Sequence, residues 1–264
     1  MDNDDRQVGK ILNRREILSL LGATGVALLA GCVPIQTNAV QPASKATVAA
    51  TSAATQAATA STVAIPSCIV RPALTEGPYF VDEKLNRSDI RSDPADGSVK
   101  EGAPLQLLFS VSQIANGGCT PLEGATVDVW HCDALGIYSD VSDPGFNTAG
   151  QKFLRGYQVT DAQGAAQFIT IYPGWYRGRA VHIHFKIRTN AGSGSMHEFT
   201  SQLFFDEAIT DQVHAQAPYA SKGQRTLKNE GDGIYHNGGS QLLISPAKGD
   251  QGYTATFAIG LNSA

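Results

Sequence analysis

Two histidines separated by a single residue lie in an apolar, β-branched run of the chain. They are His182 and His184, on either side of Ile183. In a strand, residues i and i+2 point to the same face and lie roughly 7 Å apart. Two imidazoles on one face can bind a single metal ion if the sheet brings further ligands. The same pattern also fits two half-exposed histidines with hydroxyl or carboxylate partners, so the pair alone leaves both interpretations open.

The residues just before this pair extend the chemistry that the segment can perform. Tyr176 supplies a phenol, and Arg179 supplies a guanidinium that is always charged. The segment from Tyr172 to Lys186 is therefore the candidate functional stretch of the chain.

The composition limits the partners that such a site can serve. The chain has 264 residues, enough for one large domain or two small ones, and 17% of them are charged. Its net charge is −4 and it contains no Lys/Arg cluster, so the sequence predicts neither nucleic-acid binding nor attraction to an anionic membrane surface. We see no internal repeat and predict one folded domain over residues 67–264.

Residues 1–32 predict an export signal. Asn13 to Ser19 form a twin-arginine pattern, and the apolar run from Leu18 to Ala30 is too short to span a bilayer comfortably. The run ends in Leu-Ala-Gly-Cys, which resembles a bacterial lipobox with Cys32 as the lipidated residue. We predict twin-arginine export and a membrane-anchored lipoprotein on the extracytoplasmic side. A secreted form without lipid and a short membrane anchor are the alternatives.

Residues 33–66 predict a disordered tether. Lys45 is the single charged residue in this stretch, which otherwise consists mainly of Ala, Thr, Ser, Gln, Val and Pro. Such a composition cannot bury enough apolar surface to offset the entropy of ordering the chain. The tether would join the lipid to the domain.

Three cysteines fall in the predicted domain, namely Cys68, Cys119 and Cys132. An exported domain can keep a disulfide, and three cysteines allow one bridge and one free thiol. We favour a bridge that includes Cys68, because that residue lies where the domain begins. The sequence does not select its partner.

The domain is predicted to be all-β, an antiparallel β-sandwich with long loops and little helix. Short predicted strands are separated by glycine-rich turns. In the first strand, apolar residues alternate with mostly polar ones; the apolar residues are Leu105, Leu107, Phe109 and Val111. The predicted strands are 104–114, 125–132, 153–160, 166–171, the strand of the two histidines, 198–205, 242–245 and 253–261. One short helix is predicted over 206–219, and 81–102 and 141–150 are predicted loops.

Three motifs in this domain match one known family. Gly124 to Ser139 contains Val-Asp-Val-Trp followed by Gly-Ile-Tyr; Pro173-Gly-Trp-Tyr is followed by Arg-x-x-His-Ile-His-Phe; and Thr75 to Phe80 reads Thr-Glu-Gly-Pro-Tyr-Phe. These motifs resemble intradiol ring-cleavage dioxygenases, which include the catechol 1,2- and protocatechuate 3,4-dioxygenases. The resemblance covers most of the domain, and the export signal resembles the secreted or lipoprotein branch of that family.

The resemblance implies a non-haem Fe(III) ion bound by Tyr138, Tyr176, His182 and His184. The residue types agree with this, because phenolate is a hard anionic donor that stabilises ferric iron and imidazole is a borderline ligand that suits iron. The spacing between Tyr176 and His182 is shorter than in the cytosolic enzymes. Tyr172 is therefore a rival for the second tyrosine ligand.

The implied reaction inserts both atoms of O2 into a catechol-type aromatic diol and gives a muconate-type diacid. By position, Tyr176 would leave the metal and help to accept the substrate's proton. Arg179 would stabilise negative charge on the ring. Gln202 matches a glutamine of the family site, with a plain strand amide as the alternative. Pro78 and Tyr79 would line the substrate pocket, although Tyr79 also fits an ordinary half-buried aromatic.

The predicted partners are a small aromatic diol and O2, with membrane contact only through a lipid at Cys32. A homodimer is compatible with the sequence, which selects neither the oligomeric state nor the particular catechol. The other histidines carry weaker cases. His131 is expected beside the site or packed as a polar group, and the remaining three are expected at the surface: His197, His214 and His236.

Two other functions compete for the same residues. The segment from Gly124 to Tyr176 also resembles transthyretin-like β-sandwich modules, which serve as exported stalks or binding domains without a metal. That alternative does not explain Tyr138 after its Trp-x-x-x-x-x-Gly-x spacing or the Arg-x-x-His-x-His motif, so we favour the enzyme. The second alternative is a His-X-His copper or zinc site on an exported sandwich.

Overall fold

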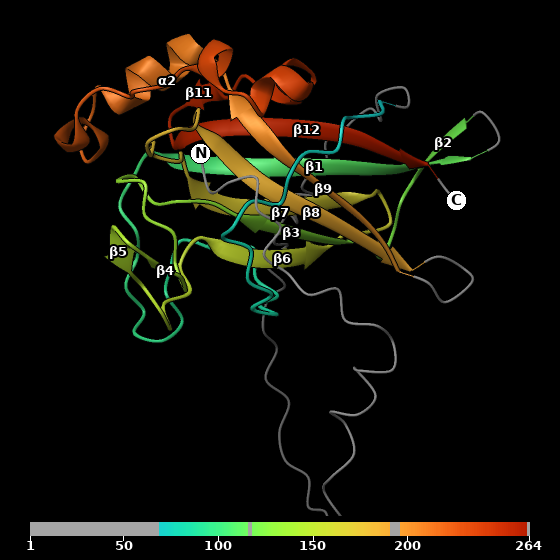
Figure 1. Ribbon diagram of the computed structural model, residues 1–264. Coiled ribbons are helices and arrows are strands. Elements are labelled where there is room, and N and C mark those ends of the chain that lie inside the picture. Colours follow the sequence, from blue (N-terminus) through green and yellow to red (C-terminus); the bar gives the residue numbers. More distant parts are fainter. Residues whose placement is uncertain (1–68, 116–117, 191–195, 263–264) are drawn as a thin grey trace, which may run out of the picture. The chain divides into compact units, whose positions relative to one another are not determined.

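The computed structural model describes residues 69–115, 118–190 and 196–262 (Figure 1). The predicted signal, lipidation site and tether lie outside these residues and stay predictions. Within them Cys119 is disulfide-bonded and Cys132 is a buried free thiol. Cys68, which we expect in the bridge, lies outside the described part. No helix of the described part is long and apolar enough to cross a membrane.

Two five-stranded sheets make up most of the fold. The first sheet has the order β11 (Ala247–Gly249), β12 (Gly252–Asn262), β1 (Pro104–Ala115) and β2 (Gly118–Pro121), with β7 (Ala165–Ile171) also paired to β1. The second has the order β10 (Leu243–Ile244), β9 (Met196–Phe205), β8 (His182–Asn190), β3 (Thr126–Trp130) and β6 (Arg155–Val159). A small hairpin pairs β4 (Ser142–Asp143) with β5 (Phe146–Asn147).

The expected all-β, sandwich-like fold is confirmed, but its strands are not all antiparallel. β1 runs parallel to β12 over ten residue pairs, from Leu105 opposite Tyr253 to Ile114 opposite Asn262. β10 likewise runs parallel to β9. The last strand reaches β1 from far along the chain, and no tight turn forces the two into opposite directions. Figure 1 shows β1 and β12 side by side.

Alternate side chains of the two sheets interlock in a shared core. The rings of Phe109 on β1 and Phe185 on β8 have centroids 5.3 Å apart, and Phe257 on β12 lies 5.4 Å from Phe185. All three side chains are buried. Because each such ring removes a large apolar surface from water, replacing one by alanine would cost about 3–5 kcal/mol.

The alternation of β8 places the two histidines on the opposite face of the second sheet. Ile183, Phe185 and Ile187 point into the core. Their neighbours, His182 and His184, therefore point away from it, because successive strand residues face opposite sides. The face that carries the histidines is covered by residues 75–83, which we call the N-terminal arm.

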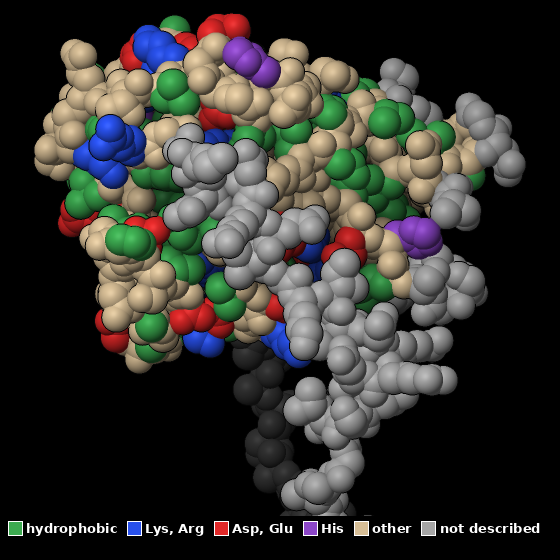
Figure 2. Space-filling model, in the orientation of Figure 1, with side chains coloured by type: hydrophobic (Ala, Val, Ile, Leu, Met, Phe, Trp, Pro, Cys, Tyr) green, Lys and Arg blue, Asp and Glu red, His purple; other side chains and the backbone are tan. Residues whose placement is uncertain are grey.

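Ion pairs fasten the N-terminal arm to the sheet. Lys186 of β8 pairs with Glu76, and the Nη1 of Arg188 lies 3.1 Å from Asp82. Arg188 also holds Asp128 of β3 through two hydrogen bonds of 2.7 and 3.0 Å. Charged side chains of both signs are interspersed with hydrophobic ones on the face shown in Figure 2.

The helical segments lie toward the same end of the sheets as the β4–β5 hairpin (Figure 1). The single helix expected over 206–219 is shorter than predicted: α2 spans Glu207–His214. It begins after Asp206 because that carboxylate accepts from the amides of Ala208 and Ile209. Four short 3₁₀ helices follow it: η2 (Tyr219–Lys222), η3 (Asn229–Gly231), η4 (Tyr235–Asn237) and η5 (Gly239–Leu242).

The expectation that His214 lies at the surface is wrong. Its side chain is buried, its Nε2 donates to the carbonyl of Pro173 at 3.0 Å, and its ring stacks on Tyr219 with centroids 5.0 Å apart. Burial lowers the pKa of His214 below its ordinary value. His197 and His236 are exposed, as expected.

His131 is a packed polar group that links the two sheets. Its Nδ1 lies 2.8 Å from the carbonyl of Cys132, which can only accept, so Nδ1 carries the proton. Its Nε2 therefore accepts from the hydroxyl of Thr170 on β7, 2.7 Å away. Burial lowers the pKa of His131 to about 4.

We expect this histidine to make the protein less stable in acid. Its pKa is about 4 when folded and ordinary when unfolded, so its stabilisation is present above pH 6.5 and is lost as the pH falls toward 4. The loss would be about 3 kcal/mol. Urea unfolding of the metal-free protein between pH 7 and 4 would measure it. His131→Gln should make this pH dependence shallower but not abolish it, because His182 and His184 are also buried with lowered pKa values. The exposed control His236→Gln should follow the parent, and equal behaviour of the two variants would contradict the assignment.

Candidate metal centre

The strand register of the second sheet assembles one wall of the site. Trp130 of β3 lies opposite Arg155 of β6 on one side and His184 of β8 on the other, and His184 lies opposite Gln202 of β9. Residues directly opposite each other on neighbouring strands share a face. Arg155, Trp130, His184 and Gln202 therefore form a row across four strands, and the rings of Trp130 and His184 stack with centroids 5.0 Å apart.

The structure brings together the four residues predicted to bind a metal. The Nε2 of His182 lies 3.0 Å from the Nε2 of His184, 3.2 Å from the hydroxyl of Tyr176 and 3.5 Å from the hydroxyl of Tyr138. Tyr138 and both histidines are at most 2% exposed, and Tyr176 is half-buried. Two phenols and two imidazoles thus converge on one point beneath the surface.

Hydrogen bonding and burial prepare the histidines for a metal. The Nδ1 of His182 lies 2.7 Å from the carbonyl of Ala180 and must donate to it, so its Nε2 presents a lone pair to the site. Burial, together with the nearby charge of Arg179, lowers the pKa of both His182 and His184. Both imidazoles are therefore neutral at pH 7, which is the form that binds metals.

The donor set fits ferric iron better than the alternatives. No group of three or more His, Cys, Asp and Glu side chains in the described part of the chain could hold a metal. The donors around His182 are instead phenols and imidazoles. Phenolate is a hard anionic ligand that stabilises a trivalent cation, and imidazole suits iron.

A turn after β3 positions Tyr138 beside the histidines. The carboxylate of Asp133 accepts from the amides of Leu135 and Ile137, both at 3.0 Å, and so closes the turn. Gly136 in this turn has a φ of +80°, and a Cβ there would lie 2.2 Å from the carbonyl oxygen of Trp175. Only glycine fits this position, which brings the segments of Tyr138 and Tyr176 together.

The structure places Tyr176, and not its rival Tyr172, beside the histidines. The hydroxyl of Tyr172 lies 2.7 Å from that of Thr210, and its ring is buried against Phe205 in the core. Tyr176 follows Trp175, whose Nε1 donates to the carbonyl of Gly223 at 3.2 Å. The hydroxyl of Tyr176 lies 3.2 Å from the Nε2 of His182, so the short turn between these two residues is sufficient to place the phenol beside the histidine pair.

Arg179 and Gln202, the two residues to which the family resemblance gives roles beside the metal ligands, contact each other. The Nη2 of Arg179 donates to Gln202 Oε1 at 2.5 Å, and the Nε2 of Gln202 donates to the carbonyl of Thr75 at 2.9 Å. Gln202 is thus both a partner of Arg179 and a group satisfied by the backbone. Its second bond joins β9 to the N-terminal arm.

Asp232 is a residue of this site that the sequence did not reveal. Its Oδ2 accepts from the Nε of Arg179 at 3.0 Å and from the amide of Ala180 at 2.7 Å. Burial alone would raise the pKa of Asp232, but the charge of Arg179 and the amides of Ala180 and Tyr235 lower it below its ordinary value. Asp232 lies in a loop between two 3₁₀ helices, where no local pattern points to the site.

We expect Asp232→Asn to lower kcat/KM by about 10–100-fold, the usual effect of removing a group that orients a site residue. The amide keeps the shape of Asp232 but removes the charge that holds Arg179. Iron content should not change. The matched control is Asp128→Asn, because Asp128 is also a buried partner of an arginine, Arg188, on the same sheet. Steady-state kinetics would contradict the prediction if the two variants lost activity equally.

The N-terminal arm covers the histidines with Gly77 and the tyrosines with Tyr79. A Cβ at Gly77 would lie 3.0 Å from Cε1 of His184. The ring of Tyr79 lies 4.6 Å from that of Tyr138, and its hydroxyl donates to Asp143 at 2.8 Å. Pro78, between them, is half-buried. Asp143 is a second residue near the site that the sequence did not indicate, because it lies in a predicted loop.

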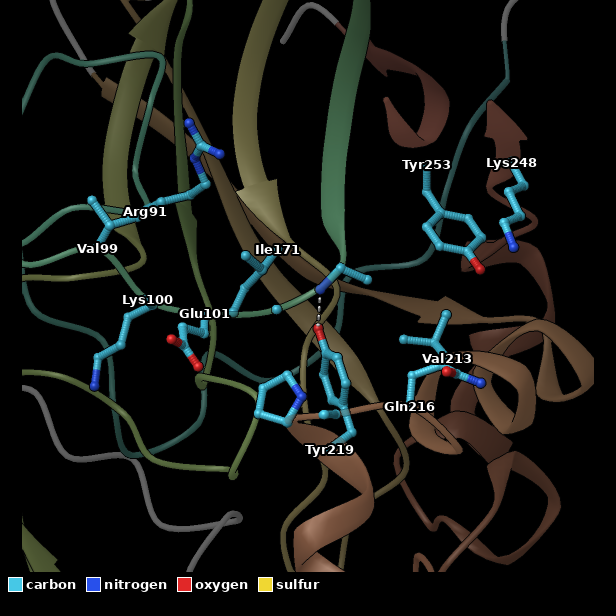
Figure 3. A pocket seen from close by; sticks show the side chains of 14 residues that line it. Arg91, Val99, Lys100, Glu101, Ile171, Val213, Gln216, Tyr219, Lys248 and Tyr253 are labelled. Carbon is cyan, nitrogen blue, oxygen red and sulfur yellow. Dashed lines mark hydrogen bonds between the residues drawn. The ribbon is translucent and has the colours of Figure 1, made fainter. Parts of the chain in front are cut away.

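A cavity of about 770 Å³ lies apart from these residues (Figure 3). Tyr219 stands in its wall and donates to the carbonyl of Tyr172, while its hydroxyl accepts from the amide of Ala103. None of the four converging side chains lines this cavity. It therefore belongs to a different part of the molecule.

The structure is thus a sandwich-like β protein with a cluster of two tyrosines and two histidines, and it is similar to known proteins of one family. A family model described as Dioxygenase matches residues 75–230. The protocatechuate 3,4-dioxygenase beta chain of Burkholderia cepacia is 32% identical over 119 residues, which are 42% of this chain and 50% of that protein.

Two solved structures are similar over most of the described part. An intradiol ring-cleavage dioxygenase from Tetranychus urticae is 30% identical with a TM-score of 0.65, over 74% of this chain and 96% of that one. The dioxygenase domain of a dioxygenase carbohydrate-binding protein fusion from Streptomyces sp. SirexAA-E is 26% identical with a TM-score of 0.53, over 74% and 100%. The chain belongs to the intradiol ring-cleavage dioxygenase family. It matches 50% and 36% of the length of two curated relatives.

Proposed function

We propose that this protein is a non-haem Fe(III) intradiol dioxygenase that inserts both atoms of O2 into a catechol-type diol and gives a muconate-type diacid. The observation that carries the proposal is the convergence of Tyr138, Tyr176 and His184 on the Nε2 of His182, at 3.0–3.5 Å. When bound, ferric iron would withdraw electron density from a chelated catecholate and make a ring carbon reactive toward O2.

The four donors would have different roles. His182, His184 and Tyr138 are fully buried and would hold the iron throughout the reaction. Tyr176 is half-buried and lies on a turn, so its phenol oxygen is the donor best placed to accept a proton from an incoming catechol hydroxyl.

Arg179 would stabilise negative charge that develops on the ring. Its guanidinium is held by Asp232 and Gln202 and is 4% exposed, so it is already oriented before the substrate arrives. A fixed charge in a site without bulk water stabilises a charged transition state more than a mobile one does. The N-terminal arm would help to exclude that water, because Gly77 and Tyr79 cover the donors.

Export and lipidation are part of the proposal. The twin-arginine pattern and the Leu-Ala-Gly-Cys sequence support a lipid anchor at Cys32, and a tether over 33–66 would hold the domain outside the cytoplasm. Twin-arginine export carries folded proteins, so the domain would take up its metal before it crosses. Its proposed partners are a small aromatic diol and O2.

The two alternatives account for fewer of the observations. A transthyretin-like module without a metal leaves the convergence of Tyr138, Tyr176 and the histidines unexplained. A copper or zinc site would use the histidines but would not require two phenols.

Oxygen uptake with a panel of diols tests the proposal. The panel contains catechol, protocatechuate, 4-methylcatechol and hydroxyquinol, each given to the iron-loaded protein. We expect one O2 consumed per diol and a ring-opened diacid as the product for at least one of them. Tightly bound zinc or copper with no oxygen uptake on any diol would overturn the proposal.

A further inference from the structure

A buried arginine beside the metal centre has no carboxylate partner. Arg155, the first residue of β6, is 2% exposed, and no ion pair joins it to an acidic side chain in the described part of the chain. The other buried guanidinium of the site, that of Arg179, is paired with Asp232. Burial of an unpaired cation is costly, so a fold that retains one places it where its charge is needed.

Two of the three guanidinium nitrogens of Arg155 donate to Ser139, the residue that follows Tyr138, and the third, Nη1, is buried without a hydrogen-bond partner in the described part of the chain. Its Nη2 and Nε lie 2.6 and 3.1 Å from the carbonyl of Ser139, and Nε lies 2.9 Å from the hydroxyl of that residue. On the other side, the hydroxyl of Thr148 donates to the carbonyl of Tyr138 at 2.6 Å. The buried side chains of Arg155 and Thr148 therefore give the carbonyls of Ser139 and Tyr138 the hydrogen bonds that a neighbouring strand would otherwise supply.

The backbone around Tyr138 needs this support, because it belongs to no strand. Asp140, two residues later, has a φ of +50°, which is a conformation that non-glycine residues rarely adopt. Such a segment keeps its shape only when its surroundings fix it. The hydrogen bonds of Arg155 and Thr148 fix this segment, and the side chain of Tyr138 is thereby held in its orientation toward His182.

The guanidinium of Arg155, bonded to the residue next to Tyr138, is also near enough to the phenol of Tyr138 for the two to interact electrostatically. Burial lowers the pKa of Arg155 to about 10, and the negative form of Tyr138 is the strongest opposing influence, ahead of Glu83 and Asp140. Arg155 therefore stays positive at pH 7. On its other side it lies opposite Trp130, which stacks on His184.

We propose that Arg155 is a positioning residue of the metal centre, which fixes Tyr138 through the carbonyl of Ser139 and places a permanent positive charge beside its phenol. The inference rests on the proposed function, since it assigns Tyr138 to the metal. It predicts that the geometry and the electronic character of the Tyr138 ligand both depend on the guanidinium.

Two variants separate the contributions of shape and charge. Arg155→Lys keeps the charge but cannot bond to Ser139 in the same fork, and Arg155→Gln removes the charge. The matched control is Arg87→Gln, because Arg87, like Arg155, donates to backbone carbonyls; its acceptors are the carbonyls of Ser92, Lys152 and Arg155. The readouts are iron affinity by chelator competition, the visible absorption band of the iron-loaded protein, and kcat and KM determined separately.

We expect both Arg155 variants to lose about 10–100-fold in iron affinity or kcat, as for other groups that orient metal ligands. The visible band should move in Arg155→Gln, because the charge beside the phenolate is gone. We expect Arg87→Gln to unfold at a lower temperature but to keep the band and kcat of the parent. An unchanged band and kcat in both Arg155 variants would overturn the proposal and leave Arg155 a purely structural residue.

Crystal structures of the metal-free proteins test the inference without iron. In the parent the hydroxyl of Tyr138 lies 3.5 Å from the Nε2 of His182. We expect this distance to increase in Arg155→Gln, or in Arg155→Lys should the first variant not fold, and to stay the same in Arg87→Gln. An undisplaced Tyr138 would overturn the positioning role. A parent that binds no ferric iron would instead overturn the proposed function, so the two failures are distinguishable.

Discussion

A His182→Ala variant is expected to fold, to bind no ferric iron and to have no detectable dioxygenase activity. The Nε2 of His182 is the atom on which the other three donors converge, at 3.0–3.5 Å. An alanine removes this ligand and leaves a gap that the remaining side chains cannot close. The fold should survive, because the lost hydrogen bond to Ala180 is worth only about 1 kcal/mol net, in addition to the cost of the small cavity.

The matched control for this variant is His197→Ala. His197 is an exposed histidine on the neighbouring strand β9, opposite Thr189, so its loss removes an imidazole without touching the site. For both variants, elemental analysis measures the iron bound per chain. Oxygen uptake is measured with the diol on which the parent is most active. Full iron content in His182→Ala, or equal losses in the two variants, would show that the metal is held elsewhere.

The second large effect is expected from Arg179→Gln, which should lower kcat/KM by about 10²–10³-fold while iron stays bound. Such losses are typical when a preorganised group that stabilises developing charge is removed. The variant also leaves Asp232 buried without its cation, which costs about 3–5 kcal/mol of stability. Activity must therefore be measured well below the melting temperature and expressed per bound iron.

Arg225→Gln is the control for that loss. The side chain of Arg225 is 5% exposed and is paired with Glu207 and Asp211 of α2, so it matches Arg179 in burial and in having carboxylate partners. It lies in a different part of the fold, and its loss should lower stability without lowering kcat/KM. A similar drop in kcat/KM for both variants would assign the effect of Arg179→Gln to stability alone.

Two core strands of the first sheet were predictable because the alternation of their side chains is strong. β1 and β7 differ from the predicted segments by a single residue at one end each. In each, every second side chain must be apolar to fill the shared core, and that requirement is visible in the sequence. The same logic puts His182 and His184 on one face, so this half of the donor set follows from the sequence itself.

Contacts between distant loops were not predictable in this way. Asp232 and Asp143 reach the site from segments whose position depends on the packing of the whole domain. His214 was expected at the surface because its polar ring is typical there, but a carbonyl 41 residues away binds it in the interior. The parallel direction of β12 beside β1 likewise depends on tertiary packing, because no short turn joins these strands.

The visible absorption spectrum of the iron-loaded protein tests the central claim most directly. Charge transfer from tyrosinate to Fe(III) should colour the parent burgundy to red, and Tyr138→Phe should weaken the band while the fold is kept. Tyr172→Phe is the control, because Tyr172 bonds to Thr210 away from the histidines, and it should leave the band unchanged. A colourless protein that holds one equivalent of zinc or copper, or a band that survives Tyr138→Phe undiminished, would contradict the tyrosine–histidine ferric centre.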